Sequence, residues 1–160
     1  MNIYWMKALE VLMGGIGTVG FAILFNIRGK KMIAACAGGV LSWGIFVLLE
    51  PLTPSEPIRY FVVAVLVSLY SEWMARVLKT PTTTFLMTSL IPLVPGGALY
   101  YTMSAMLAGN WDIFRAKGSS AVSLAVALAL GIVLTAALTK IIIASSINMR
   151  RWRMQKQQKE

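Results

Sequence analysis

The chain has 160 residues, of which 58% are hydrophobic and only 13% are charged. Soluble domains usually carry about a quarter of charged residues, so this composition predicts an all-α integral membrane protein forming a single domain, 1–160. The net charge of +9 lies in short runs beside apolar segments, which indicates membrane orientation and excludes a basic nucleic-acid-binding domain.

Metal, redox and enzyme chemistry find little support in the residue types. The chain has no histidine and one cysteine, Cys36, so an intrachain disulfide is impossible and no cluster of metal ligands is expected. No cofactor motif is present, and no nucleophile has a plausible base nearby. We therefore expect neither a cofactor nor a metal, and no enzymatic activity.

Five apolar runs predict five membrane-spanning helices, because each is long enough to cross a hydrocarbon core of about 30 Å. They cover residues 8–27, 32–49, 58–78, 85–107 and 119–147, followed by a basic tail over 148–160. Three runs carry small or polar residues at helical spacing, which predicts faces packed against protein. These are Glu10, Gly14, Thr18, Ala22 and Asn26; Ala34, Ala35, Gly38, Gly39 and Ser42; and Ser123, Ala127, Gly131, Thr135 and Thr139.

The third run, after a proline-rich loop over 50–57, is apolar until Glu72 and Arg76. These residues stand four apart and so share one helix face. Glu72 lies roughly 9 Å inside the end of the span at 1.5 Å per residue, and we expect no other acid so deep. Two interpretations remain open, namely a carboxylate that couples transport to protons and a permanent structural ion pair.

The fourth run predicts a broken helix, because Pro92, Pro95, Gly96 and Gly97 fall at its middle. Proline removes an amide donor and crowds the preceding turn, and lipid cannot satisfy the freed backbone groups. If Pro95 begins the second half-helix, the amides of Gly96, Gly97 and Ala98 form a positive helix end suited to a carboxylate. The alternative is a kink that only shapes packing.

Three more residues near the break are candidates for contact with a solute. Thr84, from a threonine-rich segment, could contact a substrate hydroxyl or cap the helix that starts there. Tyr100 and Tyr101 could face a cavity from the second half-helix or pack on a neighbouring helix. Residues 108–118 are expected to form an irregular loop.

Lysine and arginine are distributed unequally between the two ends of the predicted spans. One side receives Arg28, Lys30, Lys31, Arg76, Lys79, Arg150, Arg151, Arg153, Lys156 and Lys159, and the other has Lys7, Arg59, Arg115 and Lys117. The richer side is expected to be cytoplasmic. This places the N-terminus outside the cell membrane and the C-terminal tail inside, where it can also contact membrane lipid.

The chain resembles the small subunit of the split form of the threonine/serine exporter family. The resemblance extends over the whole chain and is carried by Ser71-Glu72-Trp73-Met74-Ala75-Arg76, Lys79-Thr80-Pro81, Thr84-Phe85 and Ile91-Pro92-Leu93-Val94-Pro95-Gly96. It implies a ten-span secondary exporter in which a larger membrane subunit of the same family is the partner. It also implies ion-gradient-driven export of threonine, serine or related carboxylates.

The number of spans fits such a partner, because five spans leave the termini on opposite sides of the membrane. A homologous partner could then pack as an inverted repeat around a site at the midplane. The alternatives are a homodimer, or a structural or channel-forming membrane subunit without its own substrate site.

Overall fold

The computed structural model describes the backbone of residues 3–157, and the side chains of residues 5–142 and of Ser145. Within these residues the chain is helical and contains no strand. The elements are α1 (Ile3–Leu24), α2 (Lys30–Leu49), α3 (Glu56–Val77), α4 (Thr82–Leu90), the 3-10 helix η1 (Ile91–Leu93), α5 (Gly96–Leu107) and α6 (Trp111–Gln157).

Membrane-spanning length confirms the predicted fold class. Four helices in the described part of the chain, α1, α2, α3 and α6, are long and apolar enough to cross a membrane, and α4–η1 with α5 forms a bent pair that could be a fifth span. The protein is therefore an all-α, multi-pass membrane protein.

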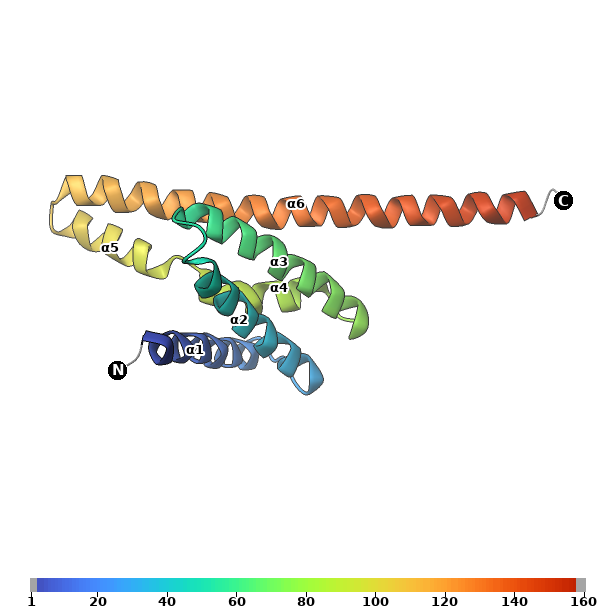
Figure 1. Cartoon of the computed structure of the whole chain (residues 1–160), viewed down its shortest axis with the longest axis horizontal. Coiled ribbons are helices and arrows are strands. Elements are labelled where there is room, and N and C mark those ends of the chain that lie inside the picture. Colours follow the sequence, from blue (N-terminus) through green and yellow to red (C-terminus); the bar gives the residue numbers. More distant parts are fainter. Residues whose placement is uncertain (1–2, 158–160) are drawn as a thin grey trace.

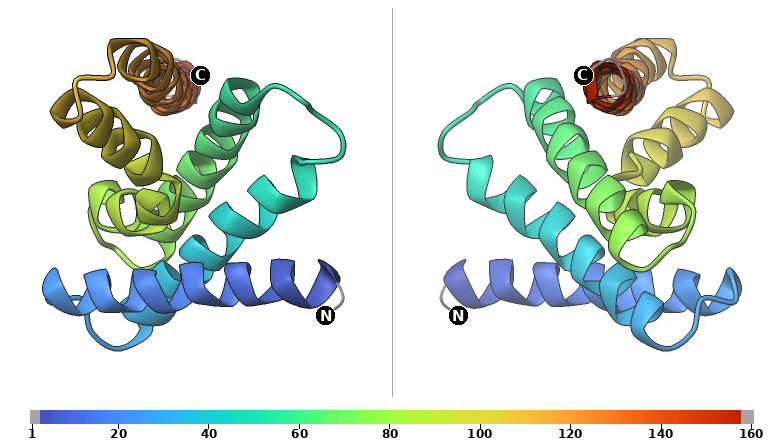
Figure 2. Two further views of the ribbon diagram at one scale, coloured as in Figure 1. Left: turned by 90° about the vertical axis from the view of Figure 1, so that its left-hand side faces the viewer. Right: turned by 90° about the vertical axis from the view of Figure 1, so that its right-hand side faces the viewer.

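The helices cross one another rather than forming a parallel bundle. Figure 1 shows α6 lengthwise, whereas Figure 2 shows it end-on while α1 runs across the view. In the middle, α4 packs against both α2 and α3, and α3 also packs against α6. The half-helix α5 has its principal contact with α6, so the two halves of the fourth span lie in different surroundings.

The predicted small-residue faces are confirmed as contacts with protein, and that protein is the chain itself. A Cβ atom added at Gly39 would collide with Thr18 of α1, and one added at Gly38 would collide with Ser89 of α4. These glycines therefore let α1 and α4 approach the backbone of α2 closely. The faces end short of the prediction, because Glu10, Asn26 and Ser123 are exposed.

Left-handed residues end three of the helices and produce tight hairpins. Asn26, Lys79 and Gly109 have φ values of 55°, 48° and 70°, and the amide of each following residue donates to a carbonyl five residues back, at 2.8 to 3.0 Å. This is the pattern of a Schellman cap. It makes α1 and α2, α3 and α4, and α5 and α6 successive neighbours.

The expected loop over 108–118 is wrong, since α6 begins at Trp111. Asn110 caps the helix, because its Oδ1 accepts the amide of Ile113 at 3.3 Å, and this polar segment contains no proline. The helix also continues to Gln157, so the predicted tail is largely helical. Lysine, arginine and glutamine are good helix formers, and their charge was mistaken for the end of the helix.

The contact between α3 and α6 generates a stability prediction. A Cβ at Gly131 would lie 2.7 Å from Ala64 Cβ and 2.9 Å from the Phe61 carbonyl oxygen, so Gly131→Val should destabilise the fold by about 1 to 3 kcal/mol. The measurement is the thermal unfolding midpoint of the purified protein in detergent. Gly20→Val is the matched control, because nothing lies within 4 Å of a Cβ there. Equal shifts for both variants would show that the α3–α6 contact does not limit stability.

Candidate functional site

The fourth span is broken where the sequence predicts. The 3-10 helix η1 ends at Leu93, α5 begins at Gly96, and the two parts meet at a bend of 56°. The amide of Val94 donates to Ile91 at 3.1 Å, and the amide of Gly96 donates to Val94 at 2.6 Å. Two local hydrogen bonds therefore satisfy part of the backbone that the prolines leave without helical partners.

The start of α5 offers two of the three amides that the sequence predicts. Pro95 lies at the N-cap position, and is not the first helical residue. The amide of Gly96 donates to the Val94 carbonyl oxygen, whereas the amides of Gly97 and Ala98 find no acceptor within the described part of the chain. This end of α5 can therefore donate two hydrogen bonds to an anion, with the helix dipole favouring negative charge.

Neither packing nor backbone conformation in this chain demands the glycine pair. Gly96 and Gly97 are exposed, nothing lies within 4 Å of a Cβ built at either position, and neither has a positive φ. Their lack of a side chain leaves the free amides open to approach. A requirement for glycine here would therefore come from outside the chain.

Tyr100 and Tyr101 lie on the exposed surface of α5. Their side chains are 68% and 59% exposed, and the two rings contact each other edge to face with centroids 5.5 Å apart. Along α5, all of whose side chains the structure describes, Ala105 is the one buried residue. The tyrosines are therefore mostly open to whatever covers this face of α5.

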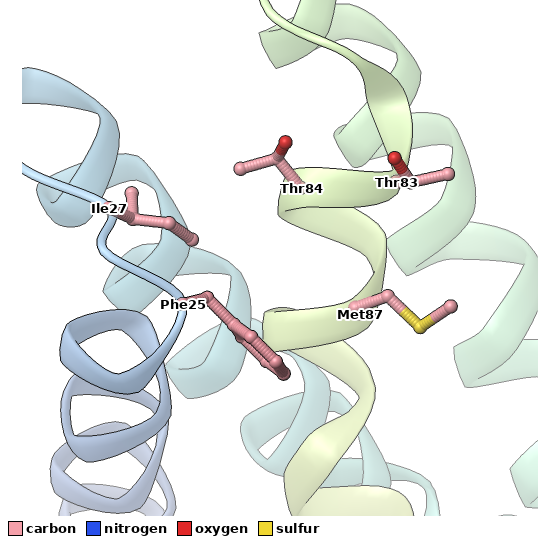
Figure 3. A pocket seen from close by; sticks show the side chains of 5 residues that line it. All are labelled: Phe25, Ile27, Thr83, Thr84 and Met87. Carbon is pink, nitrogen blue, oxygen red and sulfur yellow. The ribbon is translucent and has the colours of Figure 1, made fainter.

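Thr84 lies at the far end of α4 from the break. It lines a pocket of about 230 Å³ with Phe25, Ile27, Thr83 and Met87 (Figure 3). Ten residues of mainly helical chain separate Thr84 from Val94, which is roughly 15 Å at 1.5 Å per residue. The structure therefore does not bring Thr84 together with the break. The capping alternative is not realised either, because Pro81 lies at the N-cap of α4 and no side chain caps that helix.

Glu72 and Arg76 face each other on the last turns of α3, as their spacing predicts. Arg76 Nη2 lies 3.6 Å from Glu72 Oε2, with side-chain exposures of 55% and 25%. The contact is long and half open. The pair lies at the same end of the molecule as Thr84, because a short turn joins the end of α3 to the start of α4. In the described part of the chain, no group of three His, Cys, Asp or Glu side chains could hold a metal ion.

A second group of polar atoms, which the sequence analysis did not single out, lies where α2 approaches α3. Trp43 stacks on Phe46 with centroids 5.2 Å apart, Tyr60 meets Phe46 edge-on at 5.1 Å, and Arg59 Cζ lies 4.8 Å from the Phe46 centroid. Trp43 Nε1 and Arg59 Nε are buried and find no hydrogen-bond partner among the described residues. These residues come from two spans, so no local pattern in the sequence marks them.

Comparison with known proteins identifies the family. The family model described as Threonine/Serine exporter, ThrE, matches residues 10–138. This match extends from α1 into α6 and includes the break. Comparisons with curated proteins and with solved structures gave no match. The matched region is most of the chain, and the chain therefore belongs to the threonine/serine exporter family.

Proposed function

We propose that this chain is the small subunit of a two-component secondary exporter of threonine, serine or related carboxylates, driven by an ion gradient. Membership of the family supports a role in amino-acid export. In our proposal the substrate carboxylate binds at the start of α5. The observation that carries this location is the pair of free amides at Gly97 and Ala98, which no side chain covers.

The chemistry at the break suits a carboxylate better than it suits lipid. Unpaired amides at membrane depth need an acceptor, and the hydrocarbon of a lipid cannot supply one. A carboxylate can accept both hydrogen bonds and is stabilised by the helix dipole by roughly 0.3 to 2 kcal/mol. Water or protein must cover the same amides when the site is empty, so the break should face a hydrated cavity.

The face of α5 supports the proposal of a larger partner subunit of the same family. The small-residue faces are used inside the chain, so they provide no surface for a partner. The half-helix α5, which begins with the free amides, instead exposes large side chains along its length, namely Leu99, Tyr100, Tyr101, Met103, Met106 and Leu107. A protein partner on this face could enclose the break, which lipid alone would leave without hydrogen bonds.

The orientation of the chain in the cell membrane also belongs to this proposal. Basic residues gather at the turn between α1 and α2 and at the turn between α3 and α4. The positive-inside rule assigns these turns to the cytoplasm. The N-terminus then lies outside and the C-terminus inside. The pocket at Thr84 and the Glu72–Arg76 pair would be on the cytoplasmic side.

The glycine pair provides the direct test of the site. Gly96→Ala or Gly97→Ala should weaken the affinity for threonine by roughly 2- to 30-fold, because a methyl group obstructs an approach stabilised by the dipole. The fold should be unaffected, since nothing lies within 4 Å of the new atom. The measurement is the KM of threonine export at matched membrane levels, with Gly20→Ala as control. Unchanged KM values in both variants would move the binding site elsewhere and favour a structural subunit.

Glu72 is proposed as the coupling carboxylate. Glutamine keeps the size of the Glu72 side chain and its ability to form hydrogen bonds but cannot ionise, so Glu72→Gln should leave protein levels unchanged while threonine export no longer responds to an imposed pH gradient. Glu10→Gln, at an exposed acid of α1, is the control. Full gradient-driven export by Glu72→Gln would refute coupling at this residue. Loss of protein in Glu72→Gln and Arg76→Ala alike would instead indicate a structural pair.

The partner proposal predicts that the chain alone does not transport. Purified and reconstituted in liposomes by itself, it should give no saturable threonine efflux, because the site at α5 is incomplete without the covering subunit. Co-reconstitution with a membrane protein that co-purifies with it should restore efflux. Saturable efflux from liposomes that contain this chain alone would favour a homodimer and end the two-component proposal.

A further inference from the structure

Two buried nitrogen donors, one on α2 and one on α3, have no acceptor in the described part of the chain. They are the indole Nε1 of Trp43 and the guanidinium Nε of Arg59. Both groups can donate a hydrogen bond and neither can accept one. A buried donor without a partner costs roughly 1 to 3 kcal/mol, so the position of these two calls for an acceptor supplied from outside the chain.

The two donors flank one aromatic ring. The indole of Trp43 stacks on Phe46 with an interplanar angle of 27°, and the guanidinium of Arg59 lies 4.8 Å from the centroid of the same ring. Stacking fixes the planes of both groups and reduces the entropy lost when they bind a ligand. Their donor atoms are therefore held in place before a ligand arrives.

This cluster is continuous with the broken span. A Cβ built at Gly14 would lie 3.3 Å from Trp43 Cβ and 3.7 Å from Pro92 Cβ, so Trp43 and Pro92 pack around the same point of α1. The 3-10 helix η1, which carries Pro92, also packs against α1 and α2. Trp43 of α2 thus lies close to the first half of the break, where η1 packs.

The acid at the end of α2 is engaged chiefly by Lys7 of α1. Glu50, at the end of α2, accepts a hydrogen bond from Lys7 at 2.6 Å. This bond and the charge of Lys7 lower the pKa of the Glu50 carboxyl, with a smaller contribution from the charge of Arg59. Glu50 therefore stays ionised and paired with α1. Arg59 retains its planar donor fork, whose geometry matches a carboxylate.

We propose that Trp43 and Arg59 bind the carboxylate of the transported solute on the α2 and α3 side of the break. This inference rests on the proposed function and adds to it the side chains that recognise the solute. The ligand class is a small carboxylate. An amino acid is too polar to cross the apolar interior of the protein unless such donors form hydrogen bonds with it.

The experiment removes each donor without removing its ring or its charge. Trp43→Phe keeps an aromatic ring on Phe46 and loses the N–H, and Arg59→Lys keeps the positive charge and loses Nε. Each should raise the KM for L-threonine export roughly tenfold, as expected for one charge-assisted hydrogen bond, at unchanged protein levels. Trp73→Phe and Arg115→Lys, both at exposed positions, are the matched controls.

A competitor without a carboxylate separates recognition from packing. Threoninol, in which a CH₂OH group replaces the carboxylate, should inhibit export by the wild type and by both variants with the same inhibition constant. A parallel loss of threoninol inhibition would show that the variants only disturb packing, and would overturn the inference. Unchanged KM values in both variants, while the wild type exports threonine, would overturn the inference and leave the proposed function standing. Absence of saturable export by the wild type, measured together with the membrane protein that co-purifies with it, would overturn both.

Discussion

The structure depends on one constraint, namely that backbone hydrogen-bonding groups in a membrane must find partners within protein or water. In the fourth predicted span, Pro92 and Pro95 interrupt the helix and its backbone hydrogen bonds. The amides of Val94 and Gly96 form two local hydrogen bonds that replace part of what is lost. What remains is a pair of donors at the start of α5. The rest of the fold determines what can approach them.

The two halves of the broken span are held in different ways. The first half, α4, is fixed between α2 and α3, with Phe85, Thr88 and Ser89 fully buried and with Gly38 of α2 against Ser89. The second half, α5, packs chiefly on α6 and is otherwise exposed. A break that joins a segment packed between two helices to one packed on a single helix can change its angle without disturbing the packing of α4. This arrangement suits the opening and closing that export requires.

Close packing inside the chain changes the argument for a partner. Sequence reasoning took the three small-residue faces as possible surfaces for a second subunit, but Gly39 meets Thr18 and Gly131 meets Ala64 within this chain. Small residues at helical spacing predict contact with a helix and carry no information on which chain supplies it. The exposed face of α5 supports the partner proposal instead. The free amides at its start need hydrogen-bond acceptors, which lipid cannot supply to them.

Local patterns predicted what local physics determines. The prolines and glycines marked the break, and the spacing of Glu72 and Arg76 placed them on one face, since both depend on residues close in sequence. The cap at Asn110 was missed because charged residues around it resembled a loop, and the helical tail was missed for the same reason. Trp43 and Arg59 could not be found from sequence, because they lie on two helices that the tertiary packing of α2 against α3 brings together.

Solute protection at the break tests the central claim most directly. A variant with Cys36→Ser and Val94→Cys carries one thiol at an exposed position of the break, and labelling by a small maleimide can be followed in membranes containing the full transporter. If the carboxylate of the solute binds at the start of α5, L-threonine should slow the labelling in a saturable way, and threoninol, which has no carboxylate, should do so only at higher concentrations. Labelling at the same rate with and without L-threonine, in membranes that export it, would contradict the account.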